Sequence, residues 1–127
     1  MRILIVDDDK YILEVISRML NPEGFETKLC SSVEEAIDVL AEESFEMVIT
    51  DLFMPEMQKD GTELAQYMKR HDPSVPVLAI TGDSDDGADA YVQYAGKVAD
   101  EIMFKPLEKT KLLEMVVKYL QIDLSLR

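Results

Sequence analysis

The chain has 127 residues, 47% of them apolar, which predicts one folded domain with a packed core. Its formal net charge of −13 disfavours direct binding to nucleic acid or anionic lipid, because both require clustered Lys and Arg. Cys30 is the single cysteine and His71 the single histidine. Together they exclude an intramolecular disulfide and a structural zinc site.

The first residues fit neither a signal peptide nor a membrane span. Met1 to Val6 is a short apolar stretch, interrupted by Arg2 and followed by three aspartates at 7–9. A span would need about 20 apolar residues. We therefore expect a cytoplasmic protein that does not enter a membrane.

Strands and helices are predicted to alternate along the first half of the chain. A β-branched apolar run predicts a strand at 3–6, and an apolar stripe at helical spacing predicts a helix around 12–20. A weaker, alternating strand follows at 25–30. Ser32 and Glu35 have the spacing of a capping box, which predicts a helix from there through about Glu42.

The same alternation continues through the second half. Apolar runs predict buried strands at 47–50 and 76–80, separated by a helix from about Thr62 to Arg70. Two further apolar stripes predict helices on either side of a weak strand at 102–104. The stripes consist of Ala88, Tyr91, Val92 and Ala95, and of Leu113, Val116, Val117 and Leu120.

Five strands alternating with five helices predict an α/β fold, with a parallel sheet and helices on both faces. In such a sheet, the loops that leave the carboxyl ends of the strands lie along one edge, and ligands bind where the strand order reverses. Residues that directly follow the predicted strands are therefore the candidates for a functional site.

Five polar residues occupy these positions. They are Asp7, Asp8, Asp51, Thr81 and Lys105. Three carboxylates brought together repel one another unless a cation neutralises them, and oxygen ligands suit Mg²⁺. The sequence therefore predicts a magnesium site, which Mn²⁺ could also occupy.

A carboxylate beside such a cation can attack phosphorus and form an aspartyl phosphate. The developing negative charge would be stabilised by the metal, an ammonium group and a hydroxyl donor. In this chain, Asp51 would be the nucleophile, Lys105 the ammonium group and Thr81 the hydroxyl donor.

At these residues the chain resembles the response regulator receiver family of two-component signalling, over essentially its whole length. The matching stretches are Ile3-Leu-Ile-Val-Asp-Asp-Asp9, Val48-Ile-Thr-Asp-Leu-Phe-Met-Pro55, Asp60-Gly61, Val77-Leu-Ala-Ile-Thr-Gly82 and Ala99-Asp-Glu-Ile-Met-Phe-Lys-Pro106. Their order and their positions at predicted strand ends make the resemblance specific. It implies a flavodoxin-like, three-layer (βα)5 fold with strand order 2-1-3-4-5.

The resemblance also implies roles for individual residues. Asp51 would be the phosphoacceptor, and Thr81 the switch hydroxyl that moves toward the phosphoryl group. Lys105 would contact a phosphoryl oxygen, and its bond to Pro106 would be cis. The metal would be held by Asp7, Asp8, Asp51 and the backbone carbonyl of Phe53.

The implied function is a phosphorylation-controlled interaction module with self-catalysed phosphorylation and dephosphorylation. A histidine kinase or histidine phosphotransfer protein would donate the phosphoryl group, and an output protein or domain, which the sequence does not identify, would read the result. The face formed by the fourth helix, fifth strand and fifth helix would change partner affinity, and the chain could dimerise through it. The receiver domain would cover residues 1–120, with 121–127 as a tail or the start of a linker.

One departure from the family pattern concerns this readout. Ile102 stands where many relatives have a Tyr or Phe that rotates inward after phosphorylation. Phe104 has the same strand parity and could partly substitute, although a packing role is the simpler interpretation.

Three other functions fit parts of the pattern. A haloacid-dehalogenase-like phosphatase needs a second acid two residues after its nucleophile, where this chain has Phe53. A flavodoxin-like cofactor carrier would need a Gly-rich phosphate loop in place of a carboxylate cluster. A receiver that binds partners without phosphorylation is disfavoured because every expected reactive group is present.

Overall fold

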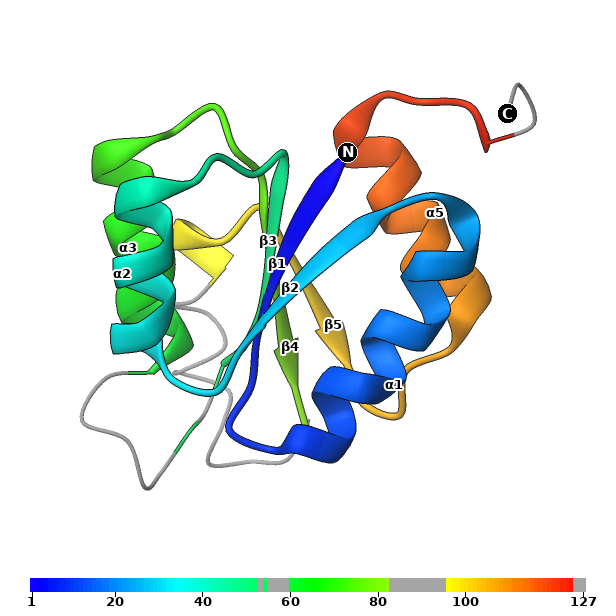
Figure 1. The fold of residues 1–127 in the computed structure, drawn as a ribbon, viewed down its shortest axis with the longest axis horizontal. Coiled ribbons are helices and arrows are strands. Elements are labelled where there is room, and N and C mark those ends of the chain that lie inside the picture. Colours follow the sequence, from blue (N-terminus) through cyan, green and yellow to red (C-terminus); the bar gives the residue numbers. More distant parts are fainter. Residues whose placement is uncertain (53, 55–59, 83–95, 125–127) are drawn as a thin grey trace.

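The structure, a computed structural model, describes residues 1–52, 54, 60–82 and 96–124. These residues form three layers, in which a five-stranded parallel sheet lies between two layers of helices (Figure 1). Helices α2 (Val33–Glu42) and α3 (Gly61–His71) cover one face of the sheet, and α1 (Lys10–Leu20) and α5 (Lys109–Leu120) cover the other. The strand order β2-β1-β3-β4-β5 confirms the predicted α/β fold.

Each strand begins and ends within one residue of its predicted position. The strands are β1 (Arg2–Val6), β2 (Glu26–Cys30), β3 (Met47–Asp51), β4 (Val77–Thr81) and β5 (Glu101–Phe104). A short 3-10 helix, η1 (Asn21–Glu23), connects α1 to β2. The helix predicted around residues 88–95 lies outside the described residues, but residues 96–98 just after it are helical.

The core is divided into two clusters, one on each face of the sheet. Successive strand residues point to opposite faces, so Leu4 and Val6 belong to the cluster beneath α2 and α3, whereas Ile3 and Ile5 belong to the cluster beneath α1 and α5. All residues of β3 and β4 are buried. This double coverage explains why these two strands are continuous apolar runs in the sequence.

Ile16 and Leu20 of α1 and Val116 of α5 are buried as the apolar stripes predicted, but each of these helices also buries a residue next to a predicted position. Leu13 of α1 and Leu112 of α5 are buried, whereas Ile12 and Leu113 are half-buried at the margin of the same cluster. Only some residues of the apolar stripe on each helix are fully buried. Sequence spacing therefore identifies the buried face of a helix more accurately than it identifies the individual buried residues.

The capping box predicted at Ser32 is only partly formed. The Ser32 hydroxyl accepts a hydrogen bond from the Glu35 amide at 3.1 Å and so caps α2. The Glu35 carboxylate, however, accepts hydrogen bonds from the amide of Ser31 at 3.4 Å and from the hydroxyl of Ser31 at 3.3 Å. The helix begins where the pattern predicted, with the return bond shifted by one residue.

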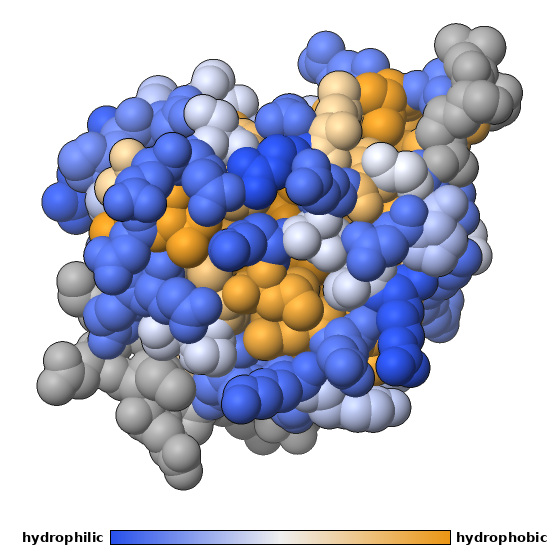
Figure 2. Space-filling model, viewed as in Figure 1, coloured by the Kyte–Doolittle hydropathy of each residue, from blue (hydrophilic) through white to orange (hydrophobic). Residues whose placement is uncertain are grey.

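Hydrophilic side chains cover most of the face shown in Figure 2, and hydrophobic ones are visible near the middle, where β2 crosses in Figure 1. On β2, which is an edge strand, exposed Glu26 and Lys28 alternate with half-buried Thr27 and Leu29. Charged residues on an edge strand oppose pairing with another chain. Among the described residues, no helix is long and apolar enough to cross a membrane, and the cytoplasmic location stays a prediction.

Candidate functional site

The carboxyl ends of the parallel strands lie together at the lower edge of the sheet in Figure 1. Asp7 directly follows β1, Asp51 and Thr81 are the last residues of β3 and β4, and Lys105 directly follows β5. The sheet thus brings to one edge side chains that are up to 98 positions apart in the sequence, from Asp7 to Lys105. These are four of the residues predicted from the sequence.

Three carboxylates form a cluster at this edge. Asp7, Asp8 and Asp51 each offer one oxygen, and these oxygens all lie within 4.8 Å of one another. Asp7 and Asp51 are buried, whereas Asp8 is partly exposed. The cluster therefore combines a closed inner side with an opening at Asp8, and its hard oxygen donors are of the kind that Mg²⁺ prefers.

Lys105 is the cation that faces this cluster. Its Nζ lies 3.7 Å from Asp7 Oδ2 and 3.9 Å from Asp51 Oδ1. Both distances are long for a hydrogen bond, and the Lys105 side chain retains 25% of its exposure. One ammonium group thus partly neutralises two buried carboxylates, which leaves net negative charge at the site.

Burial makes Asp7 a weaker acid. Removal from water raises the pKa of Asp7 to about 7 from an ordinary value of 3.8, and the negative charge of Asp51 acts in the same direction. The Asp9 amide, which donates to Asp7 Oδ1 at 2.8 Å, and the charge of Lys105 lower the pKa but only partly offset burial. A bound cation would therefore stabilise the charged form of Asp7.

Thr81 is linked directly to the segment that carries Lys105. In the parallel register of β4 and β5, Thr81 is paired with Phe104, and the Lys105 amide donates to the Thr81 carbonyl at 2.8 Å. Thr81 is buried, at 5% exposure. The Lys105–Pro106 bond that follows is cis, as the resemblance implied.

The start of α3 also contributes to this edge, and the sequence analysis did not assign it a role. Asp60 caps the helix by accepting hydrogen bonds from the amides of Thr62 at 3.0 Å and Glu63 at 3.4 Å and from the Thr62 hydroxyl. The Gly61 amide donates to the Leu52 carbonyl at 3.1 Å, next to Asp51. The Asp–x–x–Glu spacing of residues 60 and 63 is a sequence signal that could have located this cap.

The other residues considered from the sequence are not part of the described cluster. Phe53 lies outside the described residues, so its predicted carbonyl ligand is not located. His71 is the last residue of α3, whose first residue is at the site, and its ring lies 4.2 Å from that of Tyr67. Ile102 is half-buried against the α2–α3 side of the core. Phe104 is 46% exposed and belongs to neither core cluster, contrary to the packing role preferred from the sequence.

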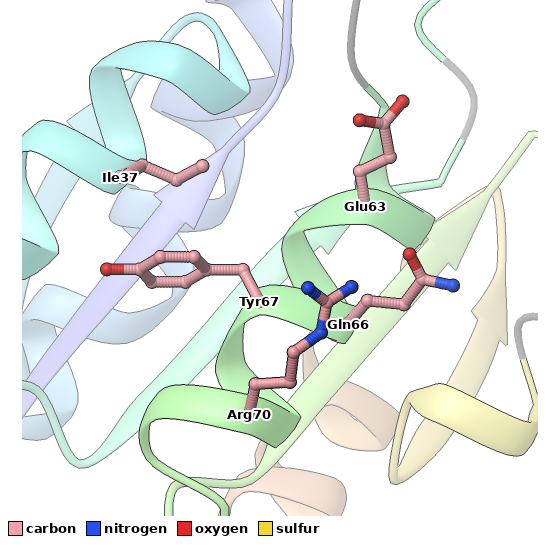
Figure 3. A pocket seen from close by; sticks show the side chains of 5 residues that line it. All are labelled: Ile37, Glu63, Gln66, Tyr67 and Arg70. Atoms are coloured by element: carbon pink, nitrogen blue, oxygen red, sulfur yellow. The ribbon is translucent and has the colours of Figure 1, made fainter.

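A separate shallow hollow of about 200 Å³ lies on the outer side of α2 and α3 (Figure 3). Its lining mixes apolar, aromatic, amide, acidic and basic side chains: Ile37, Glu63, Gln66, Tyr67 and Arg70. Ile37 and Tyr67 also pack against the core cluster beneath these helices. The hollow is therefore a seam between packed helices, and none of its residues belongs to the predicted site.

Comparison with known families and sequences extends this picture. The family model described as response regulator receiver domain matches residues 3–117. The response regulator protein FleR of Pseudomonas aeruginosa is 34% identical over 118 residues, which are 93% of this chain and 24% of FleR. Response regulator MprA of Mycolicibacterium vanbaalenii is 30% identical over 88% of this chain and 47% of MprA. The chain thus spans 24% to 47% of the length of these relatives.

Solved structures agree with the sequence comparison. A CheY-like response regulator receiver domain protein from Methanospirillum hungatei is 30% identical and superposes with a TM-score of 0.81, covering 94% of this chain and 93% of that one. NtrX from Brucella abortus, at 24% identity, shares the fold with a TM-score of 0.85 over 94% of this chain and 27% of NtrX. With the family match extending over residues 3–117, this chain belongs to the response regulator receiver domain family.

Proposed function

We propose that Asp51 accepts a phosphoryl group from a phosphohistidine donor in a Mg²⁺-dependent reaction, and that this modification switches a protein-interaction surface. The observation that carries the proposal is the grouping of Asp51 with two other carboxylates and with Lys105 at the carboxyl edge of the sheet. The donor would be a histidine kinase or a histidine phosphotransfer protein. The reader would be an output protein or domain.

The donor set at this edge fits a magnesium ion. Asp7, Asp8 and Asp51 would hold it through oxygens that already lie within 4.8 Å of one another, and the backbone carbonyl of Phe53 would be a further ligand. Mn²⁺ prefers similar oxygen ligands and could replace Mg²⁺. The bound ion would supply positive charge where negative charge develops on the phosphoryl oxygens.

In the proposed transfer, a carboxylate oxygen of Asp51 forms a bond to phosphorus while the bond from phosphorus to the donor imidazole nitrogen breaks. The electron pair of the broken bond stays on that nitrogen. The Lys105 ammonium, which faces Asp51 at 3.9 Å, would neutralise a phosphoryl oxygen, and the Thr81 hydroxyl would donate to another. Hydrolysis by water would later return Asp51 to its carboxylate form and release inorganic phosphate.

The surface that responds would include β5 and α5, together with the predicted fourth helix, which lies outside the described residues. Phe104 on β5 is exposed, and the Tyr119 hydroxyl of α5 donates to Glu101 Oε2 of β5 at 2.8 Å. Lys118 Nζ lies 3.6 Å from the same oxygen. This mixture of an aromatic ring and charged groups is suited to partner binding, and the proposed homodimer would use the same face.

We propose residues 1–120 as the receiver unit and 121–127 as a tail or the start of a linker. Helix α5 ends at Leu120, and Gln121 has the left-handed conformation common just after a helix. Ile122 and Leu124 pack against the core cluster beneath α1 and α5. The described beginning of this segment is therefore held against the domain.

The proposal is tested by incubation with a small phosphodonor and Mg²⁺, followed by intact mass measurement and site mapping. We expect one added phosphoryl group on Asp51, no addition when the metal is chelated, and no addition in Asp51→Asn. Phosphate on another residue would overturn the assignment. A wild-type chain that binds Mg²⁺ and still accepts no phosphate would support the alternative of a receiver that acts without phosphorylation.

A further inference from the structure

The first residue of α3 lies directly against the backbone of the proposed phosphoacceptor. A Cβ atom added at Gly61 would overlap the carbonyl oxygen of Asp51, and would lie 2.9 Å from the carbonyl carbon of Asp51 and 2.9 Å from Cα of Leu52. Gly61 is itself buried. Any side chain at this position would therefore meet main-chain atoms, which cannot rotate aside as the end of a flexible side chain can.

The backbone that Gly61 meets is held from three directions. The Thr50 hydroxyl donates to the Asp51 carbonyl at 3.0 Å, and the Leu52 amide donates to the Ile80 carbonyl of β4 at 2.7 Å. The Leu52 carbonyl accepts from the Gly61 amide at 3.1 Å. Since these bonds fix both ends of the peptide that joins Asp51 to Leu52, this peptide cannot move away from α3 without breaking at least one of them.

Glycine is required at position 61 because a side chain would not fit there, and not because of an unusual backbone conformation. Among the described residues, positive φ angles occur at Gly24 and Gln121 and not at Gly61. An alanine could thus adopt the backbone conformation of residue 61 but would not fit beside Asp51. Gly61 thus differs from glycines that are needed in turns for their positive φ angles.

We propose that Gly61 is a positioning residue for the phosphoacceptor, and that its missing side chain lets α3 hold the Asp51 backbone where its carboxylate meets Asp7 and Lys105. Gly61 touches no reacting atom and acts through Asp51. The proposal rests on the proposed function for its meaning in signalling, but its physical content, the placement of the Asp51 carboxylate, can be measured by metal binding alone.

A side chain at residue 61 would displace one of two partners. Helix α3 is anchored by its cap at Asp60 and by buried Leu64, Ala65 and Met68. The end of β3 is the remaining partner, and its displacement would carry Asp51 away from the other ligands. An error of about 1 Å in such a position can cost on the order of 100-fold in rate.

The test is a double-mutant cycle on Mg²⁺ affinity, measured by calorimetry or by NMR titration. Gly61→Ala is made both in the wild-type chain and in Asp51→Asn, at a temperature where circular dichroism shows every variant folded. Gly96→Ala is the matched control, because a Cβ there would meet only the end of the Ile102 side chain, at an ordinary 3.8 Å. The phosphorylation rate of each variant with an intact Asp51 is measured in parallel.

We expect Gly61→Ala to weaken Mg²⁺ binding by about tenfold or more when Asp51 is present and by much less in Asp51→Asn, because the lost ligand geometry belongs to Asp51. Phosphorylation should fall by about 100-fold, and Gly96→Ala should change neither quantity. Equal weakening in both backgrounds, or no weakening, would overturn the proposal and leave Gly61 with a packing role only.

Two further arrangements keep the test decisive. If Gly61→Ala does not fold, Thr50→Val replaces it in the same cycle, since it removes the hydrogen bond on the other side of the Asp51 carbonyl with little change in volume. Unchanged Mg²⁺ affinity in Thr50→Val would then overturn the proposal. A chain that shows the predicted coupling in Mg²⁺ binding but accepts no phosphate would refute the proposed function and retain the role of Gly61.

Discussion

The positive charge of Lys105 has opposite effects on metal binding and on the proposed phosphorylation. Its ammonium group lies 3.7 Å from Asp7 and 3.9 Å from Asp51, so it competes with a metal cation for the same carboxylates. The proposed reaction nevertheless needs this positive charge when the phosphoryl group arrives. Removing the charge should therefore act in opposite directions on metal binding and on phosphorylation.

We predict that Lys105→Gln binds Mg²⁺ more tightly than the wild type and accepts phosphate about 100-fold more slowly. Calorimetric titration with Mg²⁺ and the time course of phosphorylation measure the two effects on the same samples. Lys109→Gln is the matched control, because Lys109 pairs with Glu23 outside the site. Weaker Mg²⁺ binding in Lys105→Gln would show that the lysine organises the carboxylates instead of competing for them.

Asp7 should give the metal-free protein a characteristic pH dependence. Its pKa is raised to about 7 in the folded state from an ordinary value of 3.8, so between these values the folded chain binds the proton more strongly than the unfolded chain. The contribution of Asp7 to the free energy of unfolding therefore increases as the pH falls from about 7 toward 4, and is lost as the pH rises through 7.

This dependence can be isolated by comparing the wild type with Asp7→Asn in a metal chelator. We expect the difference between their urea midpoints to favour Asp7→Asn at about pH 8 and to shrink or reverse at about pH 5, because the variant has no carboxylate to protonate. Acidic groups remote from the site titrate alike in both proteins and cancel in the difference. A difference that stays constant across this range would place the titration elsewhere.

At the scale of elements, the N-terminal cap of α3 accepts more side-chain hydrogen bonds than the cap of any other described helix. Asp60 accepts hydrogen bonds from two amides and one hydroxyl, whereas Asp9, which caps α1, accepts from the single amide of Tyr11. Removing an N-cap side chain costs about 1 kcal/mol. The additional bonds at Asp60 should place its loss at the upper end of the usual range.

We predict that Asp60→Ala lowers the free energy of unfolding by about 2 kcal/mol, and that Asp9→Ala lowers it by less. Urea denaturation in a metal chelator measures both without a contribution from bound cation. Asp60→Asn, which keeps an acceptor oxygen, should recover most of the loss. An Asp60→Ala variant no less stable than Asp9→Ala would mean that α3 is held mainly by its buried side chains.

The elements also show what could be predicted from the sequence. Strand positions followed from apolar runs because β3 and β4 are buried on both faces, and the order of strands followed from the family resemblance. The partial capping box at Ser32 could not be predicted, because it depends on which nearby donor the Glu35 side chain meets. The burial of Leu13 in place of Ile12 could not be predicted either, because it depends on how α1 is rotated against the sheet. The contact between Gly61 and Asp51 was missed for a similar reason. Glycine is needed at residue 61 because the backbone of Asp51 lies so close, and this distance is set by the tertiary structure.

At the scale of the whole molecule, the net charge of −13 complicates any interpretation of metal binding. Cations of every kind should stabilise such a chain somewhat, because they screen the repulsion among its many carboxylates. A specific site would add a stabilisation that saturates with the free ion, and that disappears when the ligands are removed. The two contributions differ in their dependence on ion identity and on residues 7 and 8.

We predict that Mg²⁺ at about 100 times its dissociation constant raises the free energy of unfolding by about 2.7 kcal/mol, which corresponds to a melting temperature higher by roughly 10 °C. NaCl at equal ionic strength should give a smaller rise, because it acts by screening alone. The double variant Asp7→Asn, Asp8→Asn should respond equally to both salts. An equal response of wild type and double variant to Mg²⁺ would place the ion's effect in general screening.

The double variant also removes repulsion between carboxylates at the site. Its melting temperature without metal should therefore match or exceed that of the wild type, because the same carboxylates that bind Mg²⁺ destabilise the metal-free chain.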